Sequence, residues 1–501
     1  MNKIKRKKNK KRSIGPVVEI ILFALFTSVV CFLLNLIGAN GYKTETGSFE
    51  TTLIIINNIF SKSGIKYILN NSLVNFQTLE PLVMVIMSLI AVSILEASGL
   101  LKQIFTPLKR IKPKYVTLIV MLVGIISTII GDYSYALLLP VAGILYKYIG
   151  RSSSLGILTM FVAITIGYGA GIIYNYQAYQ LGNLTELSAQ SITSSYNYEL
   201  LSNIFVLIAS TIILTLVGTI VLEKFSKKYS RNEETDNLNI SKKASKITLI
   251  AFVIMMVIFV YCLIPGLPHS GLLLDREAPT YIGKLFGASS PLNQGLMFLI
   301  IAILMICGFI YGTVSRNIKN SDDYSKALTK TFEGTGYVFV LLFFMSILYE
   351  IIDWTNVSTV ISTNIVDFIG ASNVSGLILV VLAFLSIALI SVFIPATLTK
   401  WELIAPIYVP LLMRANITPA FTQTIFIAAD SVGKLLSPIY IYLIIAIGFM
   451  YKYDKDSNIS ILGTMKKTMP VILTLSLVWL VIIIGWYLLG LPIGINSGLT
   501  L

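Results

Sequence analysis

Histidine and cysteine are scarce in this chain of 501 residues. His269 is the one histidine, and Cys31, Cys262 and Cys307 all lie within apolar segments. This distribution argues against a disulfide framework, a cysteine metal site, histidine-based zinc binding and His-dependent catalytic triads. Glycine-rich phosphate loops of the GxxxxGK(S/T) type are also missing, which removes that class of nucleotide site.

Charge is sparse as well. Charged residues make up 12% of the chain and hydrophobic residues 55%, whereas a soluble domain carries about 25% charged residues. The composition therefore predicts an all-α polytopic membrane protein. The formal net charge is +14, but we expect lipid and not nucleic acid as the partner, because the basic residues gather beside apolar segments.

The N-terminal segment 1–16 shows this gathering most clearly, with eight basic residues within positions 1–12. A basic run directly before an apolar segment is typical of a cytoplasmic tail that faces anionic lipid. A signal-peptide n-region is the alternative. The apolar segment 17–37 is long for a signal peptide, and the cleavage signal at 38–40 is weak, so a retained span is favoured.

Apolar length and the positions of Lys and Arg predict nine membrane spans. The expected location is the cell membrane (the inner or plasma membrane). The charge bias places the N-terminus in the cytoplasm and the C-terminus on the outer side. Loops 38–79, 175–203 and 353–374 are expected outside, and Glu350 and Asp353 are expected to form a solvated rim there. The predicted spans are 17–37, 82–101, 157–175, 202–222, 247–265, 295–314, 336–352, 421–449 and 469–489.

Two further apolar segments, about 115–149 and about 375–413, each carry a polar interruption. Each could be a pair of crossing helices or a re-entrant hairpin. Their second arms read as about 12 residues, short of the roughly 17 needed to cross, so hairpins are favoured. One hairpin would open from the inside and the other from the outside.

That layout divides the chain into a first half, 17–222, a cytoplasmic linker, 223–246, and a second half, 247–501. Corresponding breaks in two halves of opposite orientation are typical of an inverted-repeat transporter with its site at the midplane. The repeat is inferred from the layout, because the halves show no clear residue-level identity.

Five stretches resemble one known family: TLEPLVMVIMSLIAVSILEASGLL (78–101), the acidic first hairpin tip with LLLPVAGILYKYIGR after it (137–151), FIYGTVSRNIKNSDDYSKAL (309–328), KWELIAPIYVPLLMRANITP (400–419) and DSVGKLLSP (430–438). The chain is similar to the p-aminobenzoyl-glutamate transporter (AbgT) family from about 75 to 494. The resemblance implies a homodimer with nine spans and two hairpins that moves aromatic or folate-related carboxylates by ion coupling. It implies either uptake of p-aminobenzoyl-glutamate or efflux of p-aminobenzoate and sulfonamides.

The resemblance also carries over individual residues. The first-hairpin aspartate of the family falls on Asp132, and the aspartate of the broken span falls on Asp430. The second hairpin and the proline breaks fall on Lys400, Trp401, Pro419 and Pro438.

The sequence departs from the family pattern at several site positions. An arginine is expected where Ile427 stands, and asparagines are expected where Lys434 and Gly171 stand. Small polar residues are usual in the second hairpin tip, which here reads Ala396, Thr397, Leu398 and Thr399. Because these differences fall at site positions, the resemblance predicts the fold more closely than it predicts the transported substrate.

Asp430 and Lys434 lie on one helix face, so they are expected to form a pair that substrate or a proton opens; a static ion pair is the alternative. Trp401 is expected to stack on an aromatic ring of the substrate or to pack within the hairpin. Lys400 is expected to meet the substrate carboxylate, and Thr397 and Thr399 to offer oxygens.

Asp132 is expected to be the ion-coupling carboxylate, together with Asp430. It would take up a proton or hold a sodium ion, or it would cap the following helix. No cofactor is expected beyond that coupling ion. Four glycines are expected to permit backbone breaks or close helix packing: Gly167, Gly169, Gly171 and Gly433.

Two other functions remain open. A sodium-coupled carrier of other carboxylates would need the same scaffold. An intramembrane enzyme would need a catalytic histidine, a metal cluster or a paired-acid cavity, and the sequence shows none of these. The prediction is therefore a transporter and not an enzyme.

Overall fold

The structure is a computed structural model that describes residues 14–47, 50–172, 174–226, 238–372, 374–453 and 459–501. Most of the predicted basic tail (1–13) and much of the predicted linker (227–237) lie outside the described residues. The described chain is predominantly α-helical. Its one sheet within these ranges is a hairpin of β1 (Asn40–Thr44) and β2 (Thr51–Ile55), paired antiparallel with Tyr42 opposite Leu53.

Nine described helices are long and apolar enough to cross a membrane. They confirm the prediction of an all-α polytopic membrane protein with about nine spans. One of them is the continuous stretch Lys62–Ala97, made of α2 (Lys62–Gln77) and α3 (Glu80–Ala97). The others are α1 (Pro16–Leu36), α5 with the short turn after it (Pro113–Ile130), α9 (Ile204–Ser226), α10 (Lys242–Tyr261), α12 (Pro291–Val314), α14 (Gly336–Thr355), α16 (Gly376–Phe393) and α20 (Ile461–Leu489).

The number of spanning helices among the described residues agrees with the prediction, but two of these helices are not among the nine predicted spans. Helices α5 and α16 are the first arms of the two predicted hairpins. The predicted span 157–175 corresponds to α7 (Ser153–Gly167), which is shorter than a full span. The predicted span 421–449 corresponds to two helices, α18 (Pro419–Leu436) and α19 (Ile441–Tyr453), that meet at a bend of 42°.

The second arms of the predicted hairpins are longer than expected. Helix α6 (Tyr133–Tyr148) has 16 residues and α17 (Thr397–Arg414) has 18, because each begins directly after its polar break. At 1.5 Å per residue, α17 is roughly 27 Å long. Arm length therefore no longer separates a hairpin from two crossing helices, and the re-entrant orientation stays a prediction.

Three segments expected as loops contain helices. Residues 38–79 hold the β hairpin and α2, residues 175–203 hold α8 (Tyr176–Gln190), and residues 353–374 hold α15 (Val357–Gly370). Helix α8 packs against α17, and α15 packs against β1 and α17. Apolar length finds spans, but it does not find helices that lie against other parts of the protein.

Short helices complete the described chain. They are α4 (Leu100–Phe105), α11 (Tyr281–Phe286), α13 (Ser321–Thr329) and the 3-10 turns Thr106–Arg110, Ser127–Ile130 and Lys330–Phe332.

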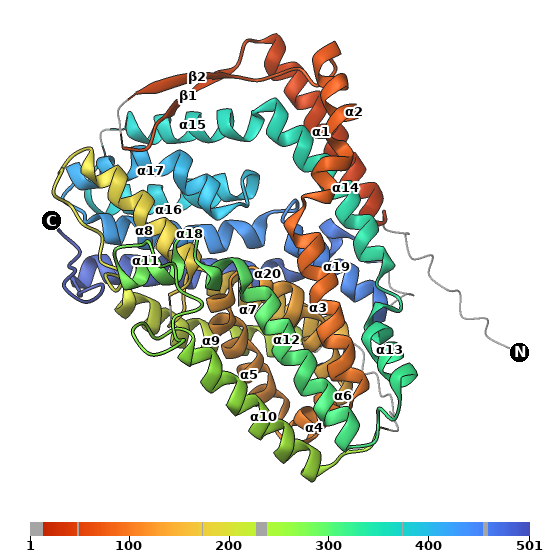
Figure 1. The fold of residues 1–501 in the computed structure, drawn as a ribbon. Coiled ribbons are helices and arrows are strands. Elements are labelled where there is room, and N and C mark those ends of the chain that lie inside the picture. Colours follow the sequence, from red (N-terminus) through yellow and green to blue (C-terminus); the bar gives the residue numbers. More distant parts are fainter. Residues whose placement is uncertain (1–13, 48–49, 173, 227–237, 373, 454–458) are drawn as a thin grey trace, which may run out of the picture.

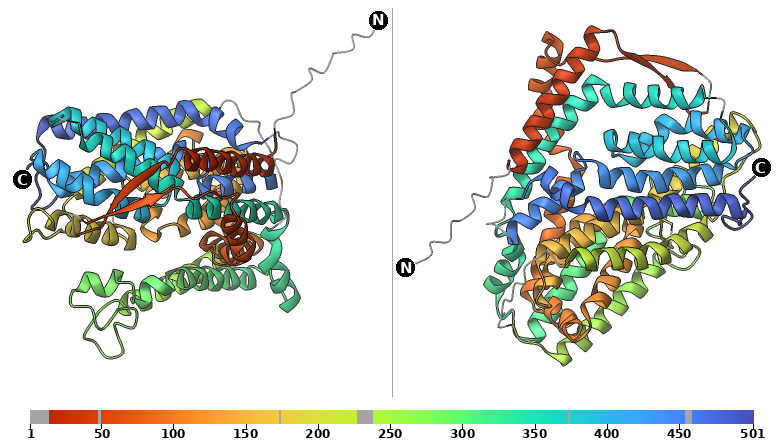
Figure 2. Two further views of the ribbon diagram at one scale, coloured as in Figure 1. Left: turned by 90° about the horizontal axis from the view of Figure 1, so that it is seen from above. Right: turned by 180° about the vertical axis from the view of Figure 1, so that it is seen from behind.

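Helix α20 runs across the middle of the molecule (Figure 1). On one side of it lie α5, α7, α9, α10 and α12, and on the other lie α15, α16 and α17; the view from behind in Figure 2 shows the same division. Helix α20 packs against α9 on the first side and against α16 and α18 on the second. The sequence halves interleave, since α12 packs against α3 and α14 against α1.

Helix α18 is the most enclosed element of this arrangement. It packs against α7, α8, α16, α17 and α20, and every residue of it except Leu436 is buried. Two of the buried residues are Asp430 and Lys434. Ionisable side chains buried in an apolar bundle need partners or a polar cavity, so this helix leads directly to the candidate site.

Candidate functional site

Asp430 lies between two lysines at the centre of the bundle. The Nζ atom of Lys400, on α17, contacts Oδ1 of Asp430, and Nζ of Lys434 lies 3.1 Å from Oδ2. Side-chain exposure is 0% for Lys400, 1% for Asp430 and 4% for Lys434. The spacing of four residues places Asp430 and Lys434 on one face of α18, and the start of α17 supplies the second lysine.

Thr397 joins this cluster at the first residue of α17. Its hydroxyl donates to Oδ2 of Asp430 at 2.7 Å, and the ammonium of Lys434 donates to the Thr397 oxygen. Lys400 also donates to the carbonyl of Ile394 at 2.8 Å, which satisfies a backbone oxygen at the break between α16 and α17. The structure thus brings together Thr397, Lys400, Asp430 and Lys434, whereas Thr399 is exposed and lies outside the cluster.

The cluster carries unequal charge. Two ammonium groups surround a single carboxylate, so the ionised triad of Lys400, Asp430 and Lys434 has a net charge of +1. Buried charge without full compensation is costly. An anion placed beside these lysines would remove that cost, so the arrangement is suited to binding a carboxylate.

Asp132 lies at the N-terminal end of α6, immediately after Gly131, whose φ is 62°. Its side chain makes no capping hydrogen bond to the helix. It accepts a hydrogen bond from the hydroxyl of Tyr168 instead. The capping role considered for Asp132 is therefore absent in this conformation, and the carboxylate faces the end of α7.

Tyr168 connects Asp132 with the lysine cluster. Its hydroxyl donates to Asp132, and its ring centre lies 4.5 Å from Nζ of Lys434. A cation over an aromatic face is attracted by the ring quadrupole. One side chain therefore contacts the carboxylate on one side and the ammonium on the other.

Tyr135, Tyr440 and Tyr442 extend this contact into an aromatic cluster. Tyr135 stacks on Tyr442 with ring centres 4.3 Å apart, and Tyr440 donates to the Tyr135 hydroxyl at 3.0 Å. These three tyrosines were not among the predicted site residues. The available signal was the pattern YSY at 133–135 and YIY at 440–442, each directly after a break.

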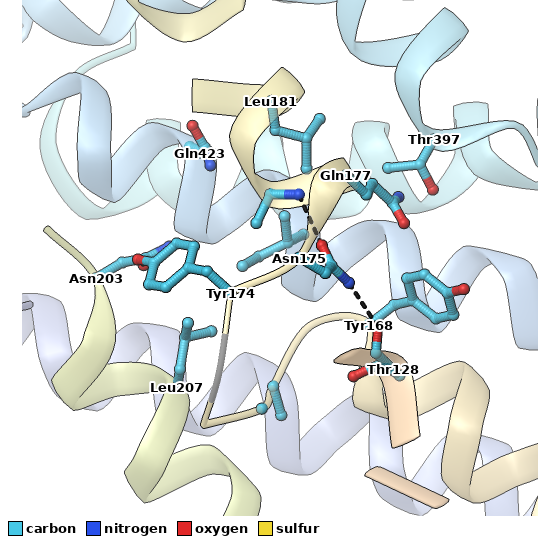
Figure 3. A pocket seen from close by; sticks show the side chains of 14 residues that line it. Thr128, Tyr168, Tyr174, Asn175, Gln177, Leu181, Asn203, Leu207, Thr397 and Gln423 are labelled. Carbon is cyan, nitrogen blue, oxygen red and sulfur yellow. Dashed lines mark hydrogen bonds between the residues drawn. The ribbon is translucent and has the colours of Figure 1, made fainter. Parts of the chain in front are cut away.

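Thr397 of the charged cluster also lines a cavity of about 60 Å³. Figure 3 shows the side chains around this cavity. Its walls come from the end of α7, the start of α8, α9, α17 and α18. Of the predicted site residues, Thr397 and Gly171 line it, and Ile427 lines it where the family resemblance placed an arginine. Residues not predicted include Thr128, Tyr168, Tyr174, Asn175, Gln177, Leu181, Asn203, Leu207 and Gln423.

Asn175 fixes the shape of this cavity. Its amide nitrogen donates to the carbonyl of Thr128, and its side-chain oxygen accepts from the backbone nitrogen of Ala178 at 2.9 Å (Figure 3). It therefore caps α8 and ties that helix to the 3-10 turn Ser127–Ile130 that precedes Asp132. The cap explains why a helix begins in a segment expected to be a loop.

Trp401 does not line the cavity. Its ring is fully buried and stacks on Phe426, with ring centres 4.2 Å apart and planes inclined by 29°. Its Nε1 atom donates to Thr185 Oγ1 at 2.9 Å, and Thr185 lies 2.6 Å from the side-chain oxygen of the cavity residue Gln423. Trp401 packs within the protein in this conformation, and its stacking on substrate stays a prediction.

The two prolines lie at the ends of α18. Pro419 is its first residue, and Pro438 lies in the break before α19. Tyr349 of α14 donates to the carbonyl of Ile439 in this break at 2.8 Å. Ser437, at the start of the break, donates to the carbonyl of Val392 in α16 at 2.8 Å. Breaks at membrane depth require such partners.

The four predicted glycines divide into two kinds. Gly171 has a φ of +129° and its nitrogen donates to Thr211 at 2.9 Å, so it permits an irregular backbone at the cavity wall. Gly167 ends α7, and Gly169 lies where a Cβ would come within 2.9 Å of the Ile427 carbonyl. Gly433 has the close-packing role that was expected as the alternative to a backbone break, because α18 continues through it and a Cβ there would strike α16.

Comparison with known proteins identifies the family of this chain. The model of the AbgT putative transporter family matches residues 10–501. The chain belongs to the AbgT family. A curated relative, the p-aminobenzoyl-glutamate transport protein of Escherichia coli strain K12, is 23% identical over 489 residues, covering 96% of this chain and 93% of the relative.

Two solved AbgT-family structures share the fold. The YdaH transporter of Alcanivorax borkumensis is 24% identical, with a TM-score of 0.51, and the match covers 96% of this chain and 100% of that one. MtrF of Neisseria gonorrhoeae, described among antimetabolite efflux pumps, is 23% identical, with a TM-score of 0.50 and coverage of 97% and 98%. Family membership confirms the resemblance seen in the sequence and makes this chain a membrane transporter, not an enzyme.

Proposed function

We propose that this AbgT-family protein is an ion-coupled secondary transporter of aromatic or folate-related carboxylates, acting as a homodimer in the cell membrane. Its cargo would be p-aminobenzoyl-glutamate moved inward, or p-aminobenzoate and sulfonamides moved outward. The observation that carries the proposal is the buried triad of Lys400, Asp430 and Lys434, with one more cation than anion. The names of the relatives support the same class of cargo.

The substrate carboxylate would bind at Thr397. This residue lines the cavity and also contacts Asp430 and Lys434, so a carboxylate entering the cavity reaches the lysine through it. Lys400 would hold Asp430 in place while Lys434 turns to the substrate. The sequence predicted that substrate or a proton opens the Asp430–Lys434 ion pair. In this proposal Lys400 continues to neutralise the charge of Asp430 when Lys434 moves away.

The cavity must enlarge for this to occur. A volume of about 60 Å³ is well below the roughly 150 Å³ of an engineered cavity that binds benzene, so it is too small for a benzoate ring. The described conformation would therefore be a closed one. The irregular backbone at Gly171 and the start of α17 are the parts whose movement would open it.

Asp132 would couple the ion to the substrate through charge. With Asp132 ionised, it and the triad together are neutral; with a proton or sodium ion on Asp132, the group has a net charge of +1. Charges separated by one aromatic ring, about 8 Å apart, interact by about 2 kcal/mol at an effective dielectric constant of about 20. That is roughly a 30-fold effect on anion affinity, so loading Asp132 favours substrate binding.

A sodium-coupled carrier of smaller, non-aromatic carboxylates is the second candidate. Ile427 in place of the family arginine and the small cavity favour it. Asp132 is the one carboxylate at the proposed ion site. The described residues contain no group of three or more acidic, histidine or cysteine side chains that could hold a metal ion. A sodium ion or a proton fits this site better than a divalent ion.

Reconstituted flux would test the proposal. Purified protein in proteoliposomes would be given labelled p-aminobenzoate, p-aminobenzoyl-glutamate or a simple dicarboxylate, under an imposed sodium or proton gradient. We expect counterflow of an aromatic carboxylate and uphill movement with one of the two gradients. Counterflow of the dicarboxylate alone would select the second candidate, and no flux of any carboxylate would contradict both.

Orientation and dimerisation would be tested separately. We expect the N-terminus in the cytoplasm and the C-terminus outside. Labelling of single cysteines placed near each end, with a reagent that does not cross the membrane, should modify only the C-terminal position in intact cells. Cross-linking in native membranes should give a species of twice the monomer mass.

A further inference from the structure

A second cavity, of about 320 Å³, lies between the junction of α2 and α3 and the C-terminal half of α14. Three carboxylates line it: Glu80, Glu350 and Asp353. Within the described ranges, no Lys, Arg or His lines this cavity. Three negative side chains without a basic neighbour in the wall repel the anionic substrate proposed above and attract a cation.

Glu350 is the most enclosed of the three carboxylates. Its exposure is 3%, and neither of its oxygens has a hydrogen-bond partner of normal geometry among the described residues. Ser72 and Asn75 on α2 are its polar neighbours. The sequence predicted a solvated rim here; the structure buries Glu350, because α2 forms a helix in the expected loop and packs against α14.

Three neutral hydroxyl oxygens of this cavity are acceptors. The hydroxyl of Thr78 donates to Val74 at 3.0 Å, that of Ser346 to Phe343 at 2.8 Å, and that of Tyr349 to Ile439 at 2.8 Å. Each hydrogen is thus committed to a backbone carbonyl, and each oxygen has only lone pairs left for a ligand. Carboxylate and hydroxyl oxygens are the ligands of hard cations.

The number of carboxylates that can contact one bound cation indicates whether a monovalent or a divalent cation suits the site. No group of three acidic, histidine or cysteine side chains in the described chain is close enough to hold a metal ion together. Glu80 and Asp353 are exposed at the edge of the cavity, whereas Glu350 lies inside. One enclosed carboxylate compensates one positive charge, and a volume of about 320 Å³ leaves room for a partly hydrated ion.

We propose that this cavity binds a monovalent inorganic cation, with Glu350 as its charged ligand and the oxygens of Ser346, Tyr349 and Thr78 as neutral ligands. The site is separate from the ion site proposed at Asp132. It adjoins the broken helix, since Tyr349 also binds the carbonyl of Ile439 between α18 and α19. A cation bound here would hold α14 against that break, and its binding does not depend on the identity of the transported substrate.

Sodium binding to the purified full-length protein tests this site. Binding of radioactive sodium would be measured for three variants: Asp132→Asn alone, the double variant Asp132→Asn, Glu350→Gln, and the double variant Asp132→Asn, Asp322→Asn. The last is the control, because Asp322 lies on the exposed surface of α13. We expect Asp132→Asn and its Asp322→Asn derivative to keep one sodium ion per chain. We expect the derivative with Glu350→Gln to lose affinity by at least about ten-fold.

Stability gives a second measurement. Removing a buried, unpartnered charge should raise the Tm of Glu350→Gln above wild type in sodium-free buffer, and added sodium should raise the Tm of wild type but not of this variant. Ser346→Ala removes one oxygen without changing charge and should weaken sodium binding several-fold. Equal sodium binding with and without Glu350→Gln or Ser346→Ala would overturn the site.

Competition identifies the kind of cation. Potassium or lithium should displace radioactive sodium, and choline should not. Displacement by choline at the concentration effective for sodium would show an organic ammonium site and contradict the proposal. Loss of all sodium binding in Asp132→Asn alone would also contradict it, because it would leave no ion for Glu350. Both outcomes are independent of whether the protein transports aromatic carboxylates.

Discussion

The ammonium of Lys434 lies 4.5 Å from the centre of the Tyr168 ring. The hydroxyl of the same ring donates to Asp132. This contact joins the aspartate of the first predicted hairpin to the charged cluster of the broken helix. It gives a physical route by which an ion at Asp132 changes the affinity for an anion at Lys434.

Tyr168→Phe should separate coupling from binding. The variant keeps the ring beside Lys434 but removes the hydrogen bond to Asp132. We expect exchange of substrate across proteoliposomes to stay within about two-fold of wild type, while gradient-driven accumulation falls several-fold. Tyr261→Phe, in the distant segment at the end of α10, is the matched control. Unchanged accumulation in Tyr168→Phe would remove the tyrosine from the coupling route.

Asp430→Asn and Lys434→Met should differ sharply. Asp430→Asn leaves two buried lysines without a carboxylate, and removal of one partner from a buried ion pair costs about 3–5 kcal/mol, so we expect a lower Tm and loss of transport. Lys434→Met leaves the Lys400–Asp430 pair intact. We expect it to fold but to raise the KM for the carboxylate at least ten-fold. Full transport by Asp430→Asn at normal expression would contradict the site.

Thr397 can be tested by its hydroxyl alone. Thr397→Val removes the hydrogen bond to Asp430 while keeping the shape, and a lost hydrogen bond to a charged group costs about 1.5–3 kcal/mol. We expect KM to rise about ten-fold or more, with Thr397→Ser close to wild type. Thr399→Val, at the exposed neighbouring position, should have no effect. Equal effects at both positions would argue against a specific role for Thr397.

Trp401→Phe distinguishes packing from substrate stacking. The variant keeps an aromatic ring against Phe426 but loses the bond from Nε1 to Thr185. If Trp401 acts as seen in the structure, the free energy of unfolding should fall by about 1 kcal/mol, and KM should change equally for aromatic and non-aromatic substrates. A larger change in KM for aromatic substrates alone would restore the stacking prediction.

Gly433→Ala tests the closeness of α18 to α16. A Cβ at this position would collide with the backbone of Ala388 and the side chain of Ser391, and overpacking costs typically about 1–3 kcal/mol. Gly485→Ala in α20 is the matched control, because no atom lies within 4 Å of its added Cβ. We expect a clear loss of Tm in detergent for Gly433→Ala only. Equal Tm values would show that the helices can separate at little cost.

Much of the scaffold could be predicted because the bilayer imposes it. An apolar run of about 20 residues has few alternatives to a spanning helix, so the membrane class and the approximate span count follow from composition. Asp430 and Lys434 could be found as charges in an apolar context, and their shared face follows from helical periodicity. Local chemistry along the chain determined these features.

Other features depend on which helices meet. Lys400 reaches Asp430 only because α17 lies against α18, and Tyr168 reaches Asp132 across 36 residues of sequence. Helix α2 buries Glu350 by packing against α14, although its own sequence reads as part of an outer loop. Trp401 turns toward Thr185 because α8, another missed helix, covers that side of α17.

The sequence by itself determined that this is a polytopic membrane protein, since long apolar runs admit few structures other than spanning helices, and its motifs resembled those of the AbgT family. Only the tertiary structure decided that two lysines surround Asp430, that Tyr168 contacts both Lys434 and Asp132, and that Glu350 is buried at a second cavity. Those outcomes follow from side-chain contacts between distant helices, where hydrogen bonds and Coulomb attraction act over a few ångströms and leave no periodic signal in the chain.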